Sequence, residues 1–186
     1  EWKWKGFTVD SLEEDSEKVI IYQWLSYMSQ VKESLDPLGE VPLVYHWSNA
    51  EQSTFESAFN SVQKRHPNEE WPEIRWYDFL SRVVRQHPII VRGSFGFGLK
   101  SIATAMHNHG LIETVWETGP TDGLGAMVGA WGSSVEANRL NCKMQDIDLM
   151  GEILKYNEID CKTMMEIIVY LRTLIVDGSD SCLAEK

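Results

Sequence analysis

The sequence predicts a single α/β domain, and three observations lead to that class. The chain has 186 residues, of which 43% are hydrophobic, and it contains eight Trp, six Tyr and six Phe. It can therefore bury a core without disulfides, which excludes a disordered, collagen-like or coiled-coil chain. Short apolar runs typical of strands alternate with longer segments of helical periodicity. We expect one domain over residues 1–176 and a tail or linker over residues 177–186.

The N-terminal segment is predicted to form a strand followed by a helix. Residues 2–9 alternate aromatic and β-branched side chains with lysines, a pattern typical of a strand, here at a sheet edge. Asp10 and Ser11 then offer a helix cap. Apolar residues recur at helical spacing from Leu12 onward, with acidic residues in the first turn, and the helix is expected to end before Asp36.

A strand, a helix and a second apolar stretch are predicted next. Residues 41–46 form a short apolar run that predicts a buried strand. Ser48 or Asn49 is expected to cap a helix that extends to about Val62. The apolar stretch over residues 74–79 leads into a further helical pattern. The remaining helices are predicted over residues 99–109, where Gly110 supplies the stop, 123–136 and 146–176.

The charge of the chain is acidic but unevenly distributed. Its 28 acidic and 17 basic residues give a net charge of −11, which argues against non-specific binding to DNA or anionic membranes. Residues 61–100 instead carry a net charge of +3. These cations could line a phosphate-binding surface or simply make a helix soluble. They are Lys64, Arg65, Arg75, Arg82, Arg85, Arg92 and Lys100.

Cysteine usage and hydropathy bear on the compartment. Three cysteines without a CxxC pair suit a reducing compartment, so an intracellular location is expected. The sequence contains no apolar run of about 18 residues, so no membrane partner is expected.

Two segments carry the residues best suited to chemistry. Tyr156 and Asp160 are four residues apart in a predicted helix, so a phenol and a carboxylate share one face. Residues 44–51 (VYHWSNAE) take an apolar strand into polar residues and place Glu51 in the first turn of a helix. Carboxylates at the C-terminal edge of strands are where α/β folds gather catalytic groups.

These segments belong to an ordered set that resembles one family. Residues 44–51 resemble its second motif, and residues 156–161 (YNEIDC) resemble its tyrosine-bearing third motif. Between them, residues 76–80 (WYDFL) and 97–102 (FGLKSI) resemble the segments that separate the two motifs. Over roughly residues 1–175 the chain resembles the DEDD-type (DnaQ-like) 3′–5′ exonucleases. Within them it is similar to a branch of nucleases related to RecB-associated exonuclease domains.

The resemblance implies a ribonuclease H-like mixed sheet flanked by helices and a two-metal mechanism with Mg²⁺ or Mn²⁺. Glu51 and Asp160 would be metal ligands, and Tyr156 would orient the attacking water. His46 would contact phosphate or support Glu51, or it is simply a satisfied strand-end histidine. Asp78 would be a rival ligand, a supporting group or a helix cap. Substrate contacts would come from Lys100, Asn49 and Arg92.

The chain departs from the family pattern in two places. The first motif, an Asp-x-Glu on the opening strand, is missing, so we expect it upstream of Glu1 together with the first strand or strands of the sheet. Glu51 stands where most members have Asp.

The expected function is 3′–5′ exonuclease activity on single-stranded or 3′-ended nucleic acid, with DNA favoured, as a module of a larger protein or a helicase, polymerase or nuclease assembly. The alternatives are an inactive ribonuclease H-like module for nucleic-acid binding or assembly, and an acidic interaction domain without a nucleic-acid role.

Overall fold

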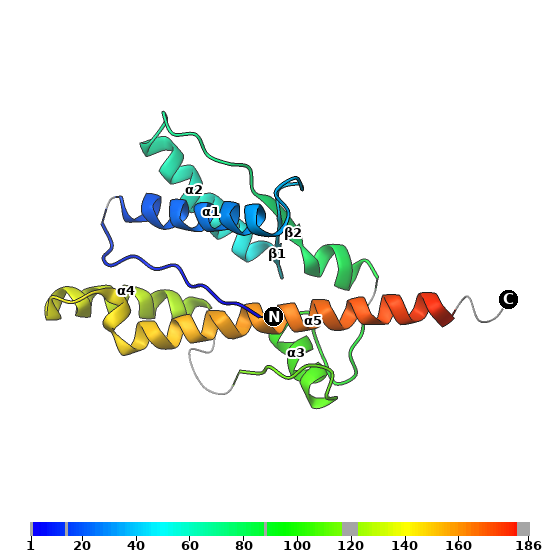
Figure 1. The fold of residues 1–186 in the computed structure, drawn as a ribbon. Helices are drawn as coiled ribbons and strands as arrows, with labels where there is room; N and C mark the ends of the chain where they lie inside the picture. Colours follow the sequence, from blue (N-terminus) through cyan, green and yellow to red (C-terminus); the bar gives the residue numbers. More distant parts are fainter. Residues whose placement is uncertain (1, 14, 88, 117–122, 182–186) are drawn as a thin grey trace.

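The structure is a computed structural model that describes residues 2–13, 15–87, 89–116 and 123–181 (Figure 1). Its α/β class agrees with the sequence prediction. In chain order the elements are α1 (Ser16–Leu35), β1 (Leu43–His46), α2 (Asn49–Arg65), β2 (Arg75–Asp78), the π-helix η1 (Leu80–Arg85), α3 (Leu99–Asn108), α4 (Gly123–Leu140), the 3₁₀ helix η2 (Met144–Asp146) and α5 (Asp148–Ser181).

A parallel β–α–β unit lies at the centre of the fold. β1 and β2 pair in parallel, from Leu43 opposite Arg75 to His46 opposite Asp78, and α2 makes the crossover between them. The predicted strand, helix and Ser48 cap are confirmed, since Ser48 accepts a hydrogen bond from the backbone of Ala50. Both C-terminal strand ends therefore meet at one edge of the sheet.

Helices cover the sheet on both sides. One core cluster, centred on Ile21, Leu25 and Val62, joins α1 and α2. The largest cluster packs Trp47, beside the sheet, against α3 and α5 through residues that include Ile102 and Ile167. α5 crosses the whole molecule, and α4 lies alongside its first half (Figure 1). No helix in the described ranges is both long and apolar enough to cross a membrane.

The prediction of a strand over residues 2–9 is wrong. This segment is extended but pairs with no strand within the described residues. Its alternating side chains instead pack against α1: the Phe7 and Tyr27 rings lie 5.7 Å apart, and the Lys5 ammonium lies 4.6 Å from the Tyr27 ring centroid. Alternating side chains over residues 2–9 are therefore compatible with an extended segment packed on a helix as well as with a strand in a sheet.

The first helix starts four residues later than predicted, because local hydrogen bonds occupy the segment before it. The Ser16 hydroxyl donates to the Ser11 carbonyl at 2.7 Å, and the Glu13 backbone N–H donates to Ser16 Oγ at 3.0 Å. Side chains of this type offer the backbone an alternative to helix. The end of α3 follows the prediction, since Gly110 has a φ of 68°.

Two glycines of α4 give a matched test of helix packing. A Cβ added at Gly132 meets nothing within 4 Å, whereas one added at Gly129 lies 3.1 Å from Ile153 Cδ1 on α5. We expect Gly132→Ala to raise the free energy of unfolding by about 0.5–1 kcal/mol through helix propensity. Gly129→Ala should gain less, because Ile153 must move. Urea unfolding of both variants measures the difference, and equal gains would contradict the close α4–α5 contact.

Candidate active site

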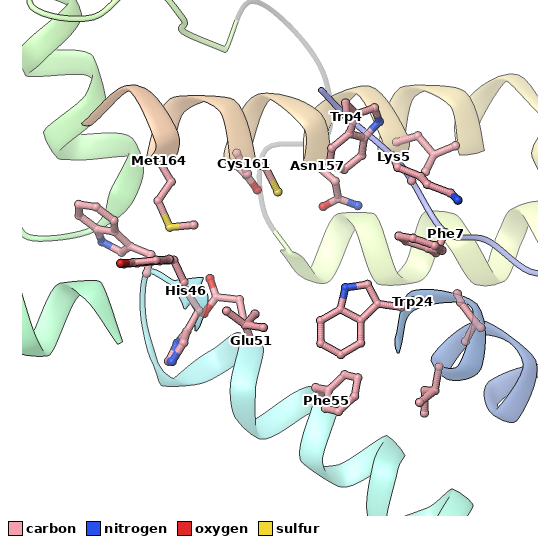
Figure 2. Close-up of a pocket in the computed structure, with 18 of the residues that line it drawn as sticks. Trp4, Lys5, Phe7, Trp24, His46, Glu51, Phe55, Asn157, Cys161 and Met164 are labelled. Atoms are coloured by element: carbon pink, nitrogen blue, oxygen red, sulfur yellow. The ribbon is translucent and has the colours of Figure 1, made fainter. Parts of the chain in front are cut away.

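A cavity of about 590 Å³ lies between β1 and α5. The extended segment over residues 4–7, together with α1 and α2, completes its walls. Figure 2 shows Asn157, Cys161 and Met164 on α5 at one side, with Trp24 and Phe55 at the other. Its apolar wall combines aliphatic side chains with aromatic ones, which include Trp4, Phe7, Trp24, Phe55 and Trp76. A concave, largely apolar pocket with a few polar groups is the usual form of a ligand site.

The two carboxylates predicted from the sequence, Glu51 and Asp160, both line this cavity. Glu51 projects from the first turn of α2, where the Ser48 hydroxyl donates to its Oε2 at 3.3 Å. Asp160 comes from the middle of α5. Burial raises the pKa of Asp160 to about 6, and the charge of Glu51 adds to this rise. The fold therefore brings together two acidic groups that lie far apart in the sequence.

Asp160 is also held by two groups that favour its charged form. The Trp116 indole N–H donates to Asp160 Oδ1 at 2.8 Å, and this hydrogen bond and the Lys100 charge both act to lower the pKa of Asp160. The Lys100 ammonium lies 4.7 Å from the Tyr156 ring centroid and 5.6 Å from the Trp116 ring. Tyr156 thus belongs to the cluster around Lys100, and it does not line the cavity.

His46 ends β1 and is only 3% exposed. Its Nδ1–H donates to the Ser48 carbonyl, and its Nε2 has no hydrogen-bond partner among the described residues. The imidazole packs edge-on against Trp76 at 5.6 Å between ring centroids. The bonded nitrogen fixes the ring beneath the start of α2, beside Glu51, which is compatible with a supporting role.

Asp78 ends β2 opposite His46 but does not line the cavity. Its two carboxylate oxygens accept hydrogen bonds from the Ser81 backbone N–H at 2.9 Å and the Ser81 hydroxyl at 2.7 Å. Burial acts to raise the pKa of Asp78, but these two bonds, together with the charges of His46 and Arg85, hold the pKa below its usual value. Of the three roles considered for Asp78, this geometry corresponds to the helix cap.

The predicted substrate-binding residues occupy two places. Asn49 is exposed at the first turn of α2, two residues before Glu51. Lys100 and Arg92 line a second, more open cavity of about 560 Å³, together with Asn108 and His109. Lys100 is the residue that links this second cavity to the Asp160 cluster.

The basic segment over residues 61–100 does not form one continuous surface. Arg65 pairs with Glu17 of α1, and Arg75 pairs with Glu40. Arg82 lies over the Tyr77 ring, 5.3 Å from its centroid. Arg65 and Arg75 are therefore paired with acidic residues of other segments, whereas Lys100 and Arg92 both line the second cavity.

The sequence did not assign Trp116 or Asn157 to the site around Asp160, although Trp116 is one of four tryptophans (71, 76, 116 and 131) that could stack bases or simply fill the core. Trp116 lies in a loop without periodicity. Its contact with the Asp160 carboxylate, on a distant helix, identifies it as a residue of the site. Asn157 lies within the YNEIDC motif and could have been found, because it precedes Asp160 by one helical turn.

No family model, curated protein or solved structure matches this chain.

The raised pKa of Asp160 predicts a measurable pH dependence of stability. The unfolded pKa is about 3.9, so between about pH 4 and 6 the folded state retains a proton that the unfolded state has released. Stability should therefore fall as the pH rises through this window, and the ionised group remains destabilising at pH 7. Asp160→Asn keeps an oxygen acceptor for Trp116 and removes the charge.

We expect the melting temperature of Asp160→Asn, measured in EDTA, to exceed that of the wild type at pH 7–8 and to match it near pH 4. Glu152→Gln is the matched control, because Glu152 is exposed on the same helix. A difference that does not change with pH would contradict the assignment.

Proposed function

We propose that this chain is the ribonuclease H-like part of a metal-dependent 3′–5′ exonuclease, which acts on single-stranded or 3′-ended nucleic acid, with DNA favoured, within a larger protein. The observation that carries the proposal is the placement of Glu51 and Asp160 on facing helices of one cavity. Phosphodiester hydrolysis by divalent ions requires clustered carboxylates at a concave site.

The two carboxylates fit the donor set of a hard cation. Carboxylate oxygens are the ligands that Mg²⁺ and Mn²⁺ take, and a bound cation would relieve the repulsion that contributes to the raised pKa of Asp160. Within the described residues no group of three or more His, Cys, Asp or Glu side chains lies close enough to share a metal. Glu51 and Asp160 would thus supply part of the coordination, and the Asp-x-Glu of the first motif would supply the rest.

The proposal includes a ribonuclease H-like sheet with a further strand beside β1. β1 pairs with β2 on one side, and the last three residues of β1, together with Trp47 directly after it, line the cavity. The extended residues 4–7 form another wall of the cavity, and α1, α2 and α5 contribute the remaining walls. We place a further strand, which carries the Asp-x-Glu, in this cavity beside β1. It would extend a two-stranded sheet that is small by comparison with most sheets.

Four other predicted residues would complete this site. A divalent ion held by Glu51 and Asp160 would supply an activated water and would neutralise the leaving oxygen. Tyr156 lies one helical turn before Asp160 on α5 but outside the cavity lining, and the proposal assigns its hydroxyl to orient the water. His46 supports Glu51 from beneath α2, and Lys100 and Arg92 neutralise phosphates of the strand near the second cavity.

A second candidate function is a ribonuclease H-like module that binds nucleic acid or assembles a complex without catalysis. The observation that favours it is the pair of carboxylates, which is fewer than a two-metal centre requires.

An exonuclease assay separates the two candidates. The full-length protein that contains these residues is incubated with 5′-labelled single-stranded DNA and RNA in Mg²⁺, Mn²⁺ or EDTA. The proposal expects release of mononucleotides from the 3′ end, with a ladder of shortened labelled products, in either metal and none in EDTA. Binding without shortening in both metals would support the module instead.

A further inference from the structure

The loop residue Trp116 makes the hydrogen bond that fixes one oxygen of Asp160. Its indole Nε1–H donates to Asp160 Oδ1 at 2.8 Å, and its ring is partly buried against the main core cluster. The bond joins the segment after α3 to the middle of α5. Trp116 does not line the cavity, whereas Asp160 does, so the bond holds a cavity carboxylate from a residue outside the lining.

The segment that carries Trp116 is itself attached to α5. The backbone N–H groups of Glu113 and Thr114 both donate to Glu166 Oε2 at 2.9 Å, and the Thr114 hydroxyl donates to Oε1 at 2.6 Å. Burial opposes ionisation of Glu166, but these hydrogen bonds hold its pKa below the usual value, so the carboxylate is charged at neutral pH. Glu166 therefore anchors the segment two residues before Trp116.

The indole ring is fixed on a second side by Lys100. The ammonium lies over both the Trp116 and the Tyr156 rings, and cation–π contacts of this kind are directional. The anchor from Glu166 and the contact with Lys100 leave the indole N–H aimed at Asp160. A carboxylate whose rotamer is fixed before the ligand arrives loses less conformational freedom on binding.

We propose that Trp116 is a positioning residue for Asp160 and that Glu166 holds it in place. The proposal rests on the proposed function for the identity of the ligand, a divalent metal ion. Removal of the indole N–H should therefore free the Asp160 side chain to take more than one rotamer and weaken metal binding. Outer partners of metal ligands typically affect affinity by about 10- to 100-fold.

The first measurement needs no metal. Three-bond couplings across χ1 of Asp160, measured by NMR in EDTA, should report one rotamer in the wild type and averaged rotamers in Trp116→Phe. Glu166→Ala, which leaves Trp116 present but releases its segment, should also give averaging. The control is Trp131→Phe, at an exposed position of α4 that does not line the cavity, and it should keep the single rotamer of the wild type. A single rotamer in Trp116→Phe would overturn the proposal.

The second measurement is the affinity for Mn²⁺, followed by electron paramagnetic resonance in the full-length protein. We expect Trp116→Phe to weaken binding about 10- to 100-fold, whereas Trp131→Phe, at an exposed position of α4, should bind as the wild type does. Unchanged affinity in Trp116→Phe would overturn the positioning role toward the metal. If Asp160→Ala leaves Mn²⁺ affinity unchanged, the proposed function is wrong, and the χ1 couplings then decide the role of Trp116 independently.

Discussion

Replacing Asp160 by alanine is expected to reduce the rate of phosphodiester cleavage on the order of 1,000-fold or more. The side chain lies in the cavity opposite Glu51 and is the more buried of the two carboxylates. A bound divalent ion contributes several kcal/mol of charge stabilisation in the transition state, and each 1.4 kcal/mol is a factor of ten in rate. Single-turnover cleavage of a 5′-labelled oligonucleotide by the full-length protein, at saturating Mn²⁺, measures the loss.

Two controls separate loss of chemistry from loss of fold. Glu152→Ala removes an acidic side chain from the exposed face of the same helix, and its rate should equal that of the wild type. Asp160→Asn should be inactive yet more stable than the wild type at pH 7–8, since it removes a charge whose burial is unfavourable. Undiminished cleavage by Asp160→Ala would rule out the assignment of this residue as a metal ligand.

Periodicity was sufficient to predict most of the helices and the first strand and crossover helix of the β–α–β unit, whereas β2 was predicted only as an apolar stretch. α2 and its Ser48 cap, α3 and its stop at Gly110, and β1 all depend on residues close together in the sequence. Local patterns of capping and hydrophobic spacing determine such elements directly. The same patterns predicted that Glu51 would stand in the first turn of a helix after a strand.

Features that depend on distant partners were not predictable in the same way. Alternation over residues 2–9 is compatible with a strand, but the outcome depended on α1, whose Tyr27 packs against Phe7. The roles of Asp78 remained open in the sequence, and the contact with Ser81 decides its geometry. No local pattern linked Trp116 to Asp160, because Asp160 lies on a helix 44 residues further along the chain.

Because the site depends on contacts between distant segments, the core beneath it helps to fix the geometry of the site. The position of Asp160 depends on how firmly α5 packs against β1 and α3. That attachment is made by the largest core cluster, in which Trp47, Ile102, Met106 and Ile167 are nearly inaccessible to solvent. Interiors of this kind are close-packed, so a change of a few methylene groups is felt by the neighbouring elements.

Truncation of Ile167 to alanine should therefore lower the free energy of unfolding by about 2–5 kcal/mol, the usual cost of a buried Ile→Ala change. Ile167 is 0% exposed and lies on the core face of α5. Urea denaturation measures the change, and an unaltered m-value would show that it arises from stability alone. Val169→Ala is the control, because Val169 is 49% exposed on the same helix and should change stability by no more than about 0.5 kcal/mol.

The same pair of variants tests how the core acts on the site. If α5 holds Asp160 in place through this cluster, Ile167→Ala should also weaken Mn²⁺ binding under conditions where the protein remains folded, whereas Val169→Ala should not. A loss of stability below 1 kcal/mol in Ile167→Ala would mean that α5 is not packed on the sheet as described. In that case the juxtaposition of Glu51 and Asp160, which depends on that packing, would lose its structural basis.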